Sequence, residues 1–448
     1  MKTTIHPQTG HGSVPGTSTK QRPVWRTLVG TGIGNAVEWY DWAVYATFTP
    51  FLAGALFSKA DKTSAVLATL AIFAVGFVAR PFGGFLFGWI GDRIGRKSSM
   101  TLAVGLASVG SLLIAVAPGY AQVGALASAT LLVARLLQGL AHGGELPSSQ
   151  TYLSEMAPKE KRGLWATLIY TSGTAGILFG TLLGATMTLV LPKVDMQAWG
   201  WRVPFAVGAA LGLYALYMRS RLHESEVFTG EDAKAKRAPI WPQIVRHRRQ
   251  ALQVIGLTVG LTVVYYIWGV VAPSHAATDL GMDRGAALWA SVIGNVVFIA
   301  ALPFWGRLSD RIGRKKVLLT GAIGSAVLHF PMTWLLKDQP WELAVSMSVM
   351  LIFIAGSASI VPAVYAELFP TSIRTVGVGV PYSICVAVFG GTAPYLQSWL
   401  GSIHLGVLFS VYAVVLLLVS AAVIFTIPET MGKDLAGAAD FSVGQNQG

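Results

Sequence analysis

The sequence carries one charged, glycine-punctuated motif twice. The first copy runs from Gly88 to Lys97 (GWIGDRIGRK) and the second from Gly306 to Lys315 (GRLSDRIGRK), about half a chain later. Each copy lies between two long apolar stretches. In a chain of membrane-spanning helices, a repeat of this kind indicates two similar halves that face each other across a central site.

The composition points to a membrane protein. Hydrophobic residues make up 53% of the 448 residues and charged residues only 12%, whereas soluble domains contain about 25% charged residues. Several apolar runs reach the roughly 20 residues that a helix needs to cross a bilayer. These runs are continuous rather than alternating, which favours helices over a β-barrel. We therefore predict an all-α integral membrane protein.

Twelve spans are expected, and residues 219–249 form the only long polar stretch between them. This stretch is predicted to link two six-helix bundles, at 27–218 and 250–427, with cytoplasmic tails at 1–26 and 428–448. The N-terminal tail has no apolar signal-peptide core, so no cleaved leader is expected. The expected spans are 27–55, 64–88, 99–117, 123–147, 163–190, 201–218, 251–273, 286–306, 317–336, 342–366, 375–400 and 404–427.

The net charge of +12 is explained by topology and requires no nucleic-acid partner. On this map most of the 33 Lys and Arg residues lie in the tails, the linker and one set of loops. Positive residues stay on the cytoplasmic side of membranes. Both termini are therefore predicted to be cytoplasmic, in a bacterial-type plasma membrane.

A second repeat supports the first. Glu155 (in EMAP) precedes Arg162 at the same spacing at which Glu367 (in ELFP) precedes Arg374. Both copies follow an even-numbered span and face the cytoplasm in the predicted topology. The two halves are therefore expected to share one six-helix plan.

The doubled motif resembles the signature loops of the major facilitator superfamily, and RLLQGLAHGGE at 135–145 is similar to its fourth-helix signature. Within it, GNAVEWYD at 34–41, RPFGG at 80–84 and WGWRVPF at 199–205 resemble the metabolite:proton symporter family. The resemblance implies the major facilitator fold, monomeric function, and transport of α-ketoglutarate-like di- or tricarboxylates, other acids, proline or betaine. Pro147 departs from the family pattern and predicts a kink in span four.

Apart from Arg202 and Glu342 at the ends of their spans, charged residues inside the predicted spans are confined to the first half. Charges in hydrocarbon cost about 2.5–3.5 kcal/mol each on insertion scales, so they should face a partner or a wet cavity. These residues are Glu38, Asp41, Arg80, Arg135 and Glu145. The second half is expected to offer shape and aromatic surface to a substrate, with His329 as its titratable group. Its candidates are Tyr265, Tyr266, Trp268, Asn295, Tyr382 and Tyr395.

Helix geometry groups the acidic residues with Arg80. A rise of 1.5 Å per residue places Glu38 and Arg80 both about 18 Å from the cytoplasmic end. Glu38, Asp41 and Tyr45 share one face by their i, i+3, i+7 spacing. A carboxylate that pairs with Arg80 in one state could take a proton when substrate claims the arginine, so Glu38 and Asp41 are both proton-site candidates. The alternative is a fixed Glu38–Arg80 pair that only holds two spans together.

Arg135 is the second candidate for binding carboxylate, because a guanidinium can donate two parallel hydrogen bonds. The alternative is that Arg135 packs against helix-end carbonyls or Glu145 and only organises the bundle. Glu145 is a proton-coupling candidate, with gating or packing as its alternative. His142 titrates near neutral pH and could relay protons or simply pack.

The loop motifs are expected to form a cytoplasmic gate. Asp92 and Asp310 can interact with a helix N-terminus, where negative charge is favoured. Arg93, Arg96 and Lys97 can pair with Glu155 or with acidic residues of the linker. Topology signalling is the alternative for the basic residues. The gating candidates are Gly88, Asp92, Arg93, Gly95, Arg96, Glu155, Arg162, Gly306, Asp310, Arg311, Gly313, Arg314, Glu367 and Arg374.

Together these features predict a secondary transporter, not an enzyme, that imports a small organic acid with protons by alternating access. The proton gradient would drive it without cofactor or metal, and the sequence has no phosphate-binding GxxxxGK[ST] loop of an ATP-driven pump. The expected partners are the organic acid, protons and the lipid bilayer. A proline/betaine zwitterion:proton symporter is the main alternative. A drug-efflux antiporter and a receptor that does not transport are less favoured, because the arginines disfavour cations and neither tail is large.

Overall fold

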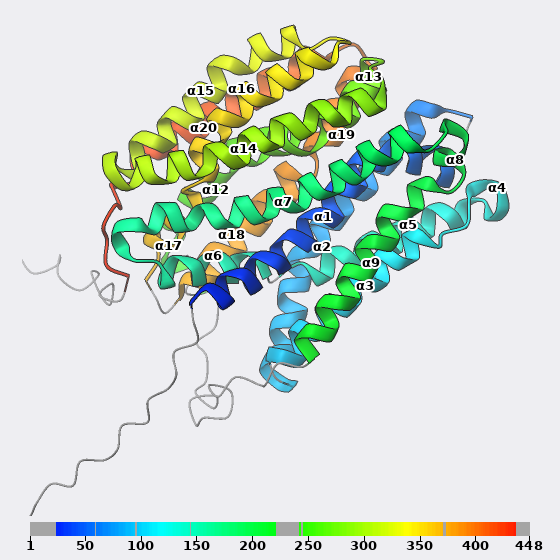
Figure 1. Ribbon diagram of the computed structural model, residues 1–448. Coiled ribbons are helices and arrows are strands. Elements are labelled where there is room, and N and C mark those ends of the chain that lie inside the picture. The colour runs from blue at the N-terminus through cyan, green and yellow to red at the C-terminus, as the bar shows by residue number, and fades with distance from the viewer. Residues whose placement is uncertain are drawn as a thin grey trace, which may run out of the picture.

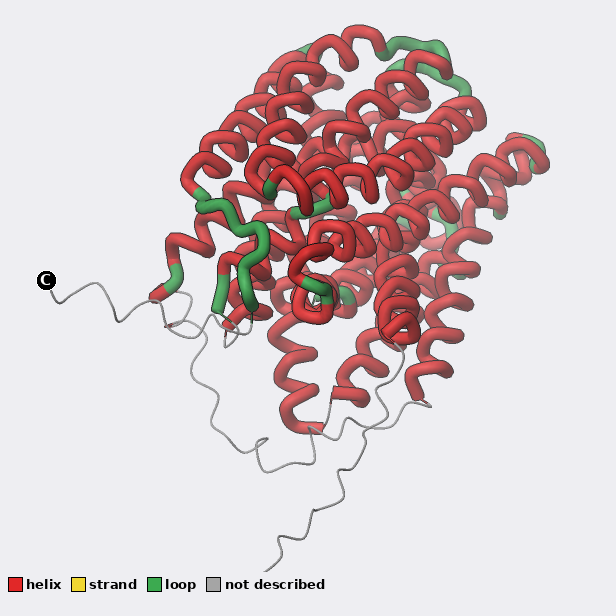
Figure 2. The backbone as a smooth tube through the Cα atoms, turned by 60° about the vertical axis from the view of Figure 1, so that its left-hand side comes forward, coloured by secondary structure: helices red, strands yellow, loops and turns green. Residues whose placement is uncertain are grey.

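The computed structural model describes residues 24–220, 242 and 245–435, apart from Lys59, Gly95, Gly144 and residues 371–372. Every regular element in this part of the chain is a helix. Figure 1 shows the helices as a bundle, with α7 between α1 and α14. Figure 2 shows that the long helices run alongside one another and that most loops lie at their ends.

The first half supplies six spans separated by short elements. The loop helices are α4 (Tyr120–Val123) and α8 (Lys193–Ala198). The spans are α1 (Val24–Leu56), α2 (Lys62–Ile94), α3 (Arg96–Ala115), α5 (Ala125–Ala141) with α6 (Glu145–Met156), α7 (Arg162–Val190) and α9 (Val203–Ser220).

The second half repeats this plan. Two of its spans each contain a π-helical turn, η4 (Tyr266–Val271) and η6 (Val386–Gly390). The spans are α12 (Arg248–Tyr265) continuing through η4 into α13 (Ala272–Asp279), α14 (Arg284–Ile312), α15 (Arg314–Leu335), α16 (Pro340–Ala358) with α17 (Val361–Leu368), α18 (Arg374–Cys385) continuing through η6 into α19 (Ala393–Ser402), and α20 (Gly406–Thr426).

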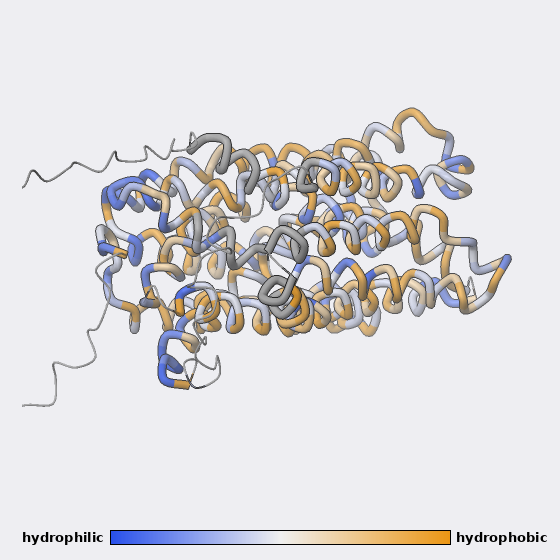
Figure 3. Tube along the Cα trace, turned by 90° about the horizontal axis from the view of Figure 1, so that it is seen from below, coloured by the Kyte–Doolittle hydropathy of each residue, from blue (hydrophilic) through white to orange (hydrophobic). Residues whose placement is uncertain are grey.

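Each expected span contains a helix, so the predicted all-helical twelve-span plan is confirmed. By length and composition alone, eight helices of the described chain are long and apolar enough to cross a membrane, and shorter apolar helices accompany them. Figure 3 shows apolar residues along the length of the helices and hydrophilic residues gathered toward the ends of the bundle. The protein is a multi-pass membrane protein.

Span four is broken rather than merely kinked. The helix α5 ends at Ala141 and α6 begins at Glu145, which places Pro147 in the first turn of α6. A proline is tolerated there because its missing N–H would have no partner in the helix. Span ten repeats the device, since α16 ends at Ala358 and Pro362 lies in the first turn of α17.

Candidate functional site

Glycines bring α2 and α5 into backbone contact at the centre of the first half. A Cβ atom added to Gly139 would lie 2.0 Å from the carbonyl oxygen of Gly76, and one added to Gly143 would lie 2.0 Å from that of Arg80. No side chain fits in these spaces. The close approach fixes Arg80 beside the break in span four.

Arg80 forms the ion pair that the depth argument predicted. Its Nη2 atom lies 3.0 Å from Oε1 of Glu38, and both side chains are buried. The guanidinium also lies 4.4 Å from the ring centre of Trp42 and 4.7 Å from that of Phe77. The pair therefore joins α1 to α2 inside an aromatic surround.

Arg135 is fully buried and has donors to spare. It lies 3.9 Å from the ring centre of Trp42 and 4.3 Å from that of Tyr45. Its Nη1 atom donates to Oε1 of Gln138 at 2.8 Å, whereas its Nε and Nη2 atoms have no hydrogen-bond partner in the described part of the chain. The helix-end carbonyls expected in the alternative interpretation are thus not its partners.

A directed chain of hydrogen bonds joins Arg135 to Asp41. Gln138, which accepts from Arg135, in turn donates from its Nε2 atom to Oγ of Ser111 at 2.8 Å. Oγ of Ser111 then donates to Oδ1 of Asp41 at 3.1 Å. Asp41 therefore faces α3. Its position on the same helix face as Glu38 had suggested that it would face Arg80 instead. Sequence reasoning missed Ser111 and Gln138, although Gln138 lies in the fourth-helix motif, one turn from Arg135.

Two tyrosines at the junction of α12 and η4 close the centre from the second half. The ring of Tyr266 stacks on Trp39 of α1 at 5.9 Å, and that of Tyr265 meets Trp39 edge-on at 5.4 Å. The Tyr265 hydroxyl lies 3.3 Å from Oγ1 of Thr174. The buried Tyr266 hydroxyl has no hydrogen-bond partner among the described residues. The centre thus has spare donors from both halves and aromatic walls.

The other candidates of the second half bond within their own half. Nε1 of Trp268 donates to Nδ1 of His329 at 3.3 Å. Asn295 donates to Ser291 of its own helix. Tyr382 pairs with the ring of Tyr365 at 6.1 Å. These contacts lie within the second half, and the place of Trp268 and Asn295 in a substrate site stays a prediction.

The remaining candidates of the first half are His142, Tyr45 and Glu145. His142 is buried at the break, 6.3 Å from Trp42 by ring centres, and its Nδ1 atom has no partner in the described chain. The hydroxyl of Tyr45 donates to the Thr69 carbonyl at 2.8 Å. The side chain of Glu145 lies outside the described residues.

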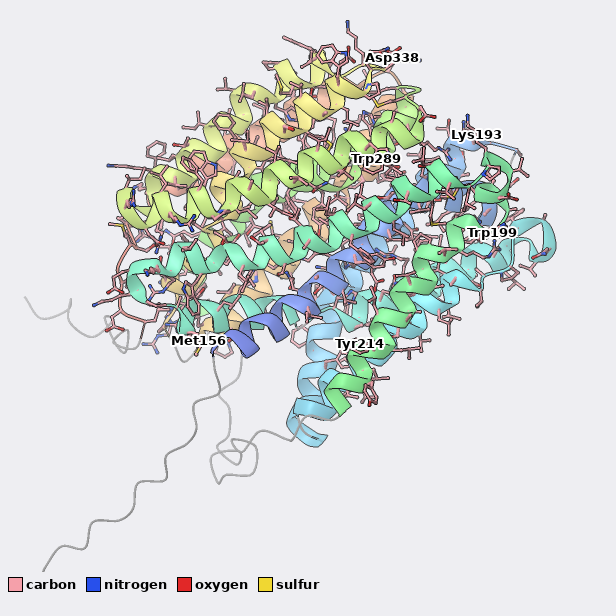
Figure 4. All side chains as sticks on the ribbon, viewed as in Figure 1. Met156, Lys193, Trp199, Tyr214, Trp289 and Asp338 are labelled. Atoms are coloured by element: carbon pink, nitrogen blue, oxygen red, sulfur yellow. The ribbon has the colours of Figure 1, made fainter. Side chains whose placement is uncertain are left out.

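Reciprocal ion pairs join the halves at the end of the bundle that is predicted to face the cytoplasm. Arg162 of the first half lies 2.9 Å from Oε1 of Glu367 in the second, and Arg374 of the second half lies 2.6 Å from Oε1 of Glu155 in the first. Figure 4 marks this end with Met156. Arg374 is the partner that the described residues give Glu155. The pairing of Glu155 with Arg93, Arg96 or Lys97 stays a prediction, because those side chains lie outside the described residues. The equal spacing of Glu and Arg in the two repeats was the sequence feature from which this exchange of partners between the halves could have been inferred.

Asp310 ties the second loop motif to the first half, as predicted. Its carboxylate accepts from the backbone N–H groups of Gly163 and Leu164, at 2.8 and 2.9 Å, at the start of α7. Arg314 donates to the same carboxylate at 2.7 Å. A Cβ at Gly306 would lie 2.9 Å from the Gly163 carbonyl oxygen, so glycine permits the close approach of α14 and α7.

The structure describes some of the remaining gate candidates and not others. Gly313 ends α14 with φ of 104°, a conformation that favours glycine. Arg311 is exposed. In the first loop motif, Gly95 lies outside the described residues, as do the side chains of Asp92, Arg93 and Arg96; Gly88 is helical.

The segment after α20 crosses this gate, which sequence reasoning missed. The Thr430 hydroxyl donates to Oε2 of Glu367 at 2.6 Å, and Nζ of Lys433 donates to the Glu367 carbonyl at 2.7 Å. The Glu429 carboxylate accepts from the backbone N–H of Arg314 at 2.9 Å. Partial burial opposes ionisation of Glu429, but backbone N–H donors, that of Arg314 first, together hold its pKa below the ordinary value.

The model of the sugar (and other) transporter family matches residues 28–241 and 233–440, one match for each half. The α-ketoglutarate permease of Escherichia coli (strain K12) is 35% identical over 90% of this chain and 93% of its own. A proline/betaine transporter of Salmonella typhimurium (strain LT2) is 28% identical over 92% and 85%.

The fold is that of solved transporters. The proton:xylose symporter XylE bound to 6-bromo-6-deoxy-D-glucose superposes with a TM-score of 0.72 at 19% identity, over 92% of this chain and 97% of that one. At this identity the match shows the fold alone. With the family match over both halves, it follows that the chain belongs to the sugar (and other) transporter family of the major facilitator superfamily.

Proposed function

We propose that the protein is a proton-coupled symporter that imports a small organic acid by alternating access. In this proposal it works as a monomer in a bacterial-type plasma membrane with both termini inside. The single observation that carries the proposal is the buried Arg135, whose Nε and Nη2 atoms have no acceptor in the described part of the chain. Buried donors of this kind suit a carboxylate, which can accept two parallel hydrogen bonds from one guanidinium.

Two arginines and aromatic walls suit an acid with one or two carboxylates. The guanidinium groups of Arg80 and Arg135 share the ring of Trp42 between them. The Tyr266 hydroxyl can donate to the same anion from the other half. A 35% identical relative is an α-ketoglutarate permease, which favours an α-ketoglutarate-like acid.

Asp41 is the proposed proton site. All donors in the chain from Arg135 through Gln138 and Ser111 point toward its carboxylate. A proton on Asp41 removes the negative charge at the end of that chain, so the Arg135 charge attracts a substrate anion more strongly. Proton and substrate then favour each other's binding, as symport requires. Glu38, paired with Arg80, is the alternative proton site.

The cytoplasmic ion pairs are the proposed inner gate. They connect the halves directly, so they must break when the inner end opens. The free energy of the proton gradient drives the cycle, and the proposal includes no cofactor or metal. The gate residues would alternate between this closed arrangement and one in which Arg162 and Arg374 face water.

Uptake into proteoliposomes tests the proposal. Labelled α-ketoglutarate, citrate, shikimate and betaine are offered with and without an inward proton gradient. Arg135→Lys keeps the positive charge but removes the two parallel N–H donors of the guanidinium. We expect the efficiency of acid uptake to fall about 30- to 1,000-fold, the loss for a buried charged donor. Lys316→Gln, at an exposed position, is the matched control.

The outcomes separate the candidates. Gradient-driven acid uptake that falls in Arg135→Lys, in protein of unchanged thermal stability, supports the proposal. Uptake of betaine alone supports the zwitterion symporter, which the proline/betaine relative makes the second candidate. Acid uptake that ignores both the gradient and Arg135 overturns the mechanism.

A further inference from the structure

A small cavity lies between the two halves at the end of the bundle opposite the cytoplasmic gate. It takes its walls from α1 and α7 of the first half and from α13 and α14 of the second. Figure 4 marks this end with Lys193 and Asp338. The residues that line it include Thr47, Phe51, Thr188, Ser274 and Arg284. The line along which the two halves meet here is called the seam. The cavity thus lies on the path that opens when the outer ends of the halves separate.

Arg284 crosses the seam at this cavity. It is the first residue of α14, and its guanidinium lies 4.5 Å from the ring centre of Phe51 on α1. It forms no ion pair with any carboxylate in the described part of the chain. The adjacent Asp283 carboxylate is used in capping α14, where it accepts from the Ala286 backbone at 3.1 Å. The Arg284 guanidinium therefore lies against a ring of the opposite half, and its N–H groups can still donate hydrogen bonds to a second partner.

The other cations of the outer end are arranged differently. Arg202 donates to the carbonyls of Ala198 and Ala117 within the first half. Lys62, Lys193 and Lys337 are exposed. Of the outer cations in the described chain, Arg284 is thus the one that lies against a ring of the opposite half.

We propose that Arg284 is an entry site for carboxylate anions at the outer mouth, and that its contact with Phe51 latches that mouth. Because the two groups belong to opposite halves, outward opening separates them and exposes the guanidinium to arriving anions. A carboxylate offers charge-assisted hydrogen bonds that a ring cannot. After the anion moves inward, the guanidinium returns to the ring and the mouth closes. The entry role rests on the proposed organic-acid substrate, whereas the latch does not.

Transport kinetics test the entry role. In Arg284→Gln we expect the KM for the acid to rise about three- to thirty-fold, with kcat changed less, because capture precedes the central site. Added salt should raise KM in the wild type and in Arg284→Lys but hardly in Arg284→Gln, because salt screens a mouth charge. Lys337→Gln, an outer cation away from the seam, should keep the wild-type KM.

Thiol labelling tests the latch without any substrate. Ser274 lines the cavity and is buried, and the only native cysteine, Cys385, is buried as well. A membrane-impermeant maleimide should label Ser274→Cys slowly. Adding Arg284→Gln should speed labelling about two- to tenfold, as expected for loss of a cation–π contact. Adding Lys337→Gln should not.

The two assays separate failure of this inference from failure of the proposed function. If the wild type takes up no acid, the proposed substrate is wrong and the entry role falls with it, while faster labelling in Arg284→Gln still supports the latch. If the wild type takes up acid and Arg284→Gln matches Lys337→Gln in KM and in labelling rate, Arg284 is neither entry site nor latch.

Discussion

Arg80 and Arg135 are buried with one tryptophan between them. Their guanidinium carbons lie 4.4 and 3.9 Å from the ring centre of Trp42. Cation–π contacts are worth up to about 2 kcal/mol when desolvated, so the ring compensates part of the cost of burying two like charges. Among the described residues, only Arg80 also has a carboxylate in direct contact, Glu38. Arg135 is thus the arginine prepared to receive an anion from outside the chain.

A pair of substitutions decides whether Glu38–Arg80 is a coupling element or a fixed tie. Arg80→Met alone leaves a buried carboxylate and should lower the free energy of unfolding by about 3–5 kcal/mol. The double variant Arg80→Met with Glu38→Gln should recover most of that loss, as a thermal-shift assay would show. A stable double variant that still accumulates acid against its gradient would identify a structural tie. One that binds acid but no longer accumulates it would identify a coupling pair.

Among the helices, the spacing of α2 and α5 depends on missing side chains. Gly139 faces the Gly76 carbonyl, and a Cβ there would come within 2.0 Å of a backbone atom that cannot move alone. The same contact places Arg80 and Arg135 on facing helices. The helix pair is therefore sensitive to single methyl groups.

Gly139→Ala should thus separate α2 from α5 and lower the melting temperature by several degrees, since overpacking costs about 1–3 kcal/mol. Gly54→Ala is the matched control, because Gly54 is also helical but a Cβ there meets nothing within 4 Å. A melting temperature that is equal in the two variants would show that the α2–α5 contact is softer than its geometry indicates.

Across the whole molecule, the two ends are closed by different chemistry. The proposed inner end is joined by the buried Arg162–Glu367 pair, by the Arg374–Glu155 pair and by Asp310 at the start of α7. The outer end is joined by Arg284 against Phe51 and by apolar packing. Breaking one partner of a buried ion pair costs more than breaking a ring contact. The resting equilibrium should therefore favour opening at the outer end.

Glu367→Gln tests the inner closure. It leaves Arg162 without its buried carboxylate, so the inner end should open more often. A cysteine at Ala157, which is buried beside the gate, should then react with maleimide at least about tenfold faster. Lys316→Gln should leave the rate unchanged, and an unaltered rate in Glu367→Gln would remove these pairs from the gate.

Much of the architecture could be predicted from the sequence because it depends on local composition. Continuous apolar runs, the duplicated loop motif and the Glu–Arg repeat were sufficient for twelve helices in two similar halves. Helical rise alone predicted that Glu38 and Arg80 meet, since depth along a straight helix follows from counting residues. The preference of negative charge for helix N-termini predicted that Asp310 would find one.

The partners across helices were decided by tertiary structure alone. Asp41 and Glu38 share a face by count, yet the packing of α3 gives Asp41 to Ser111 and that of α2 gives Glu38 to Arg80. Glu155 pairs with Arg374 of the other half because the two similar halves exchange partners. Sequence periodicity determines which side of a helix a residue occupies. Which neighbour lies there depends on how closely glycines let the helices approach, and that distance is a property of the folded molecule.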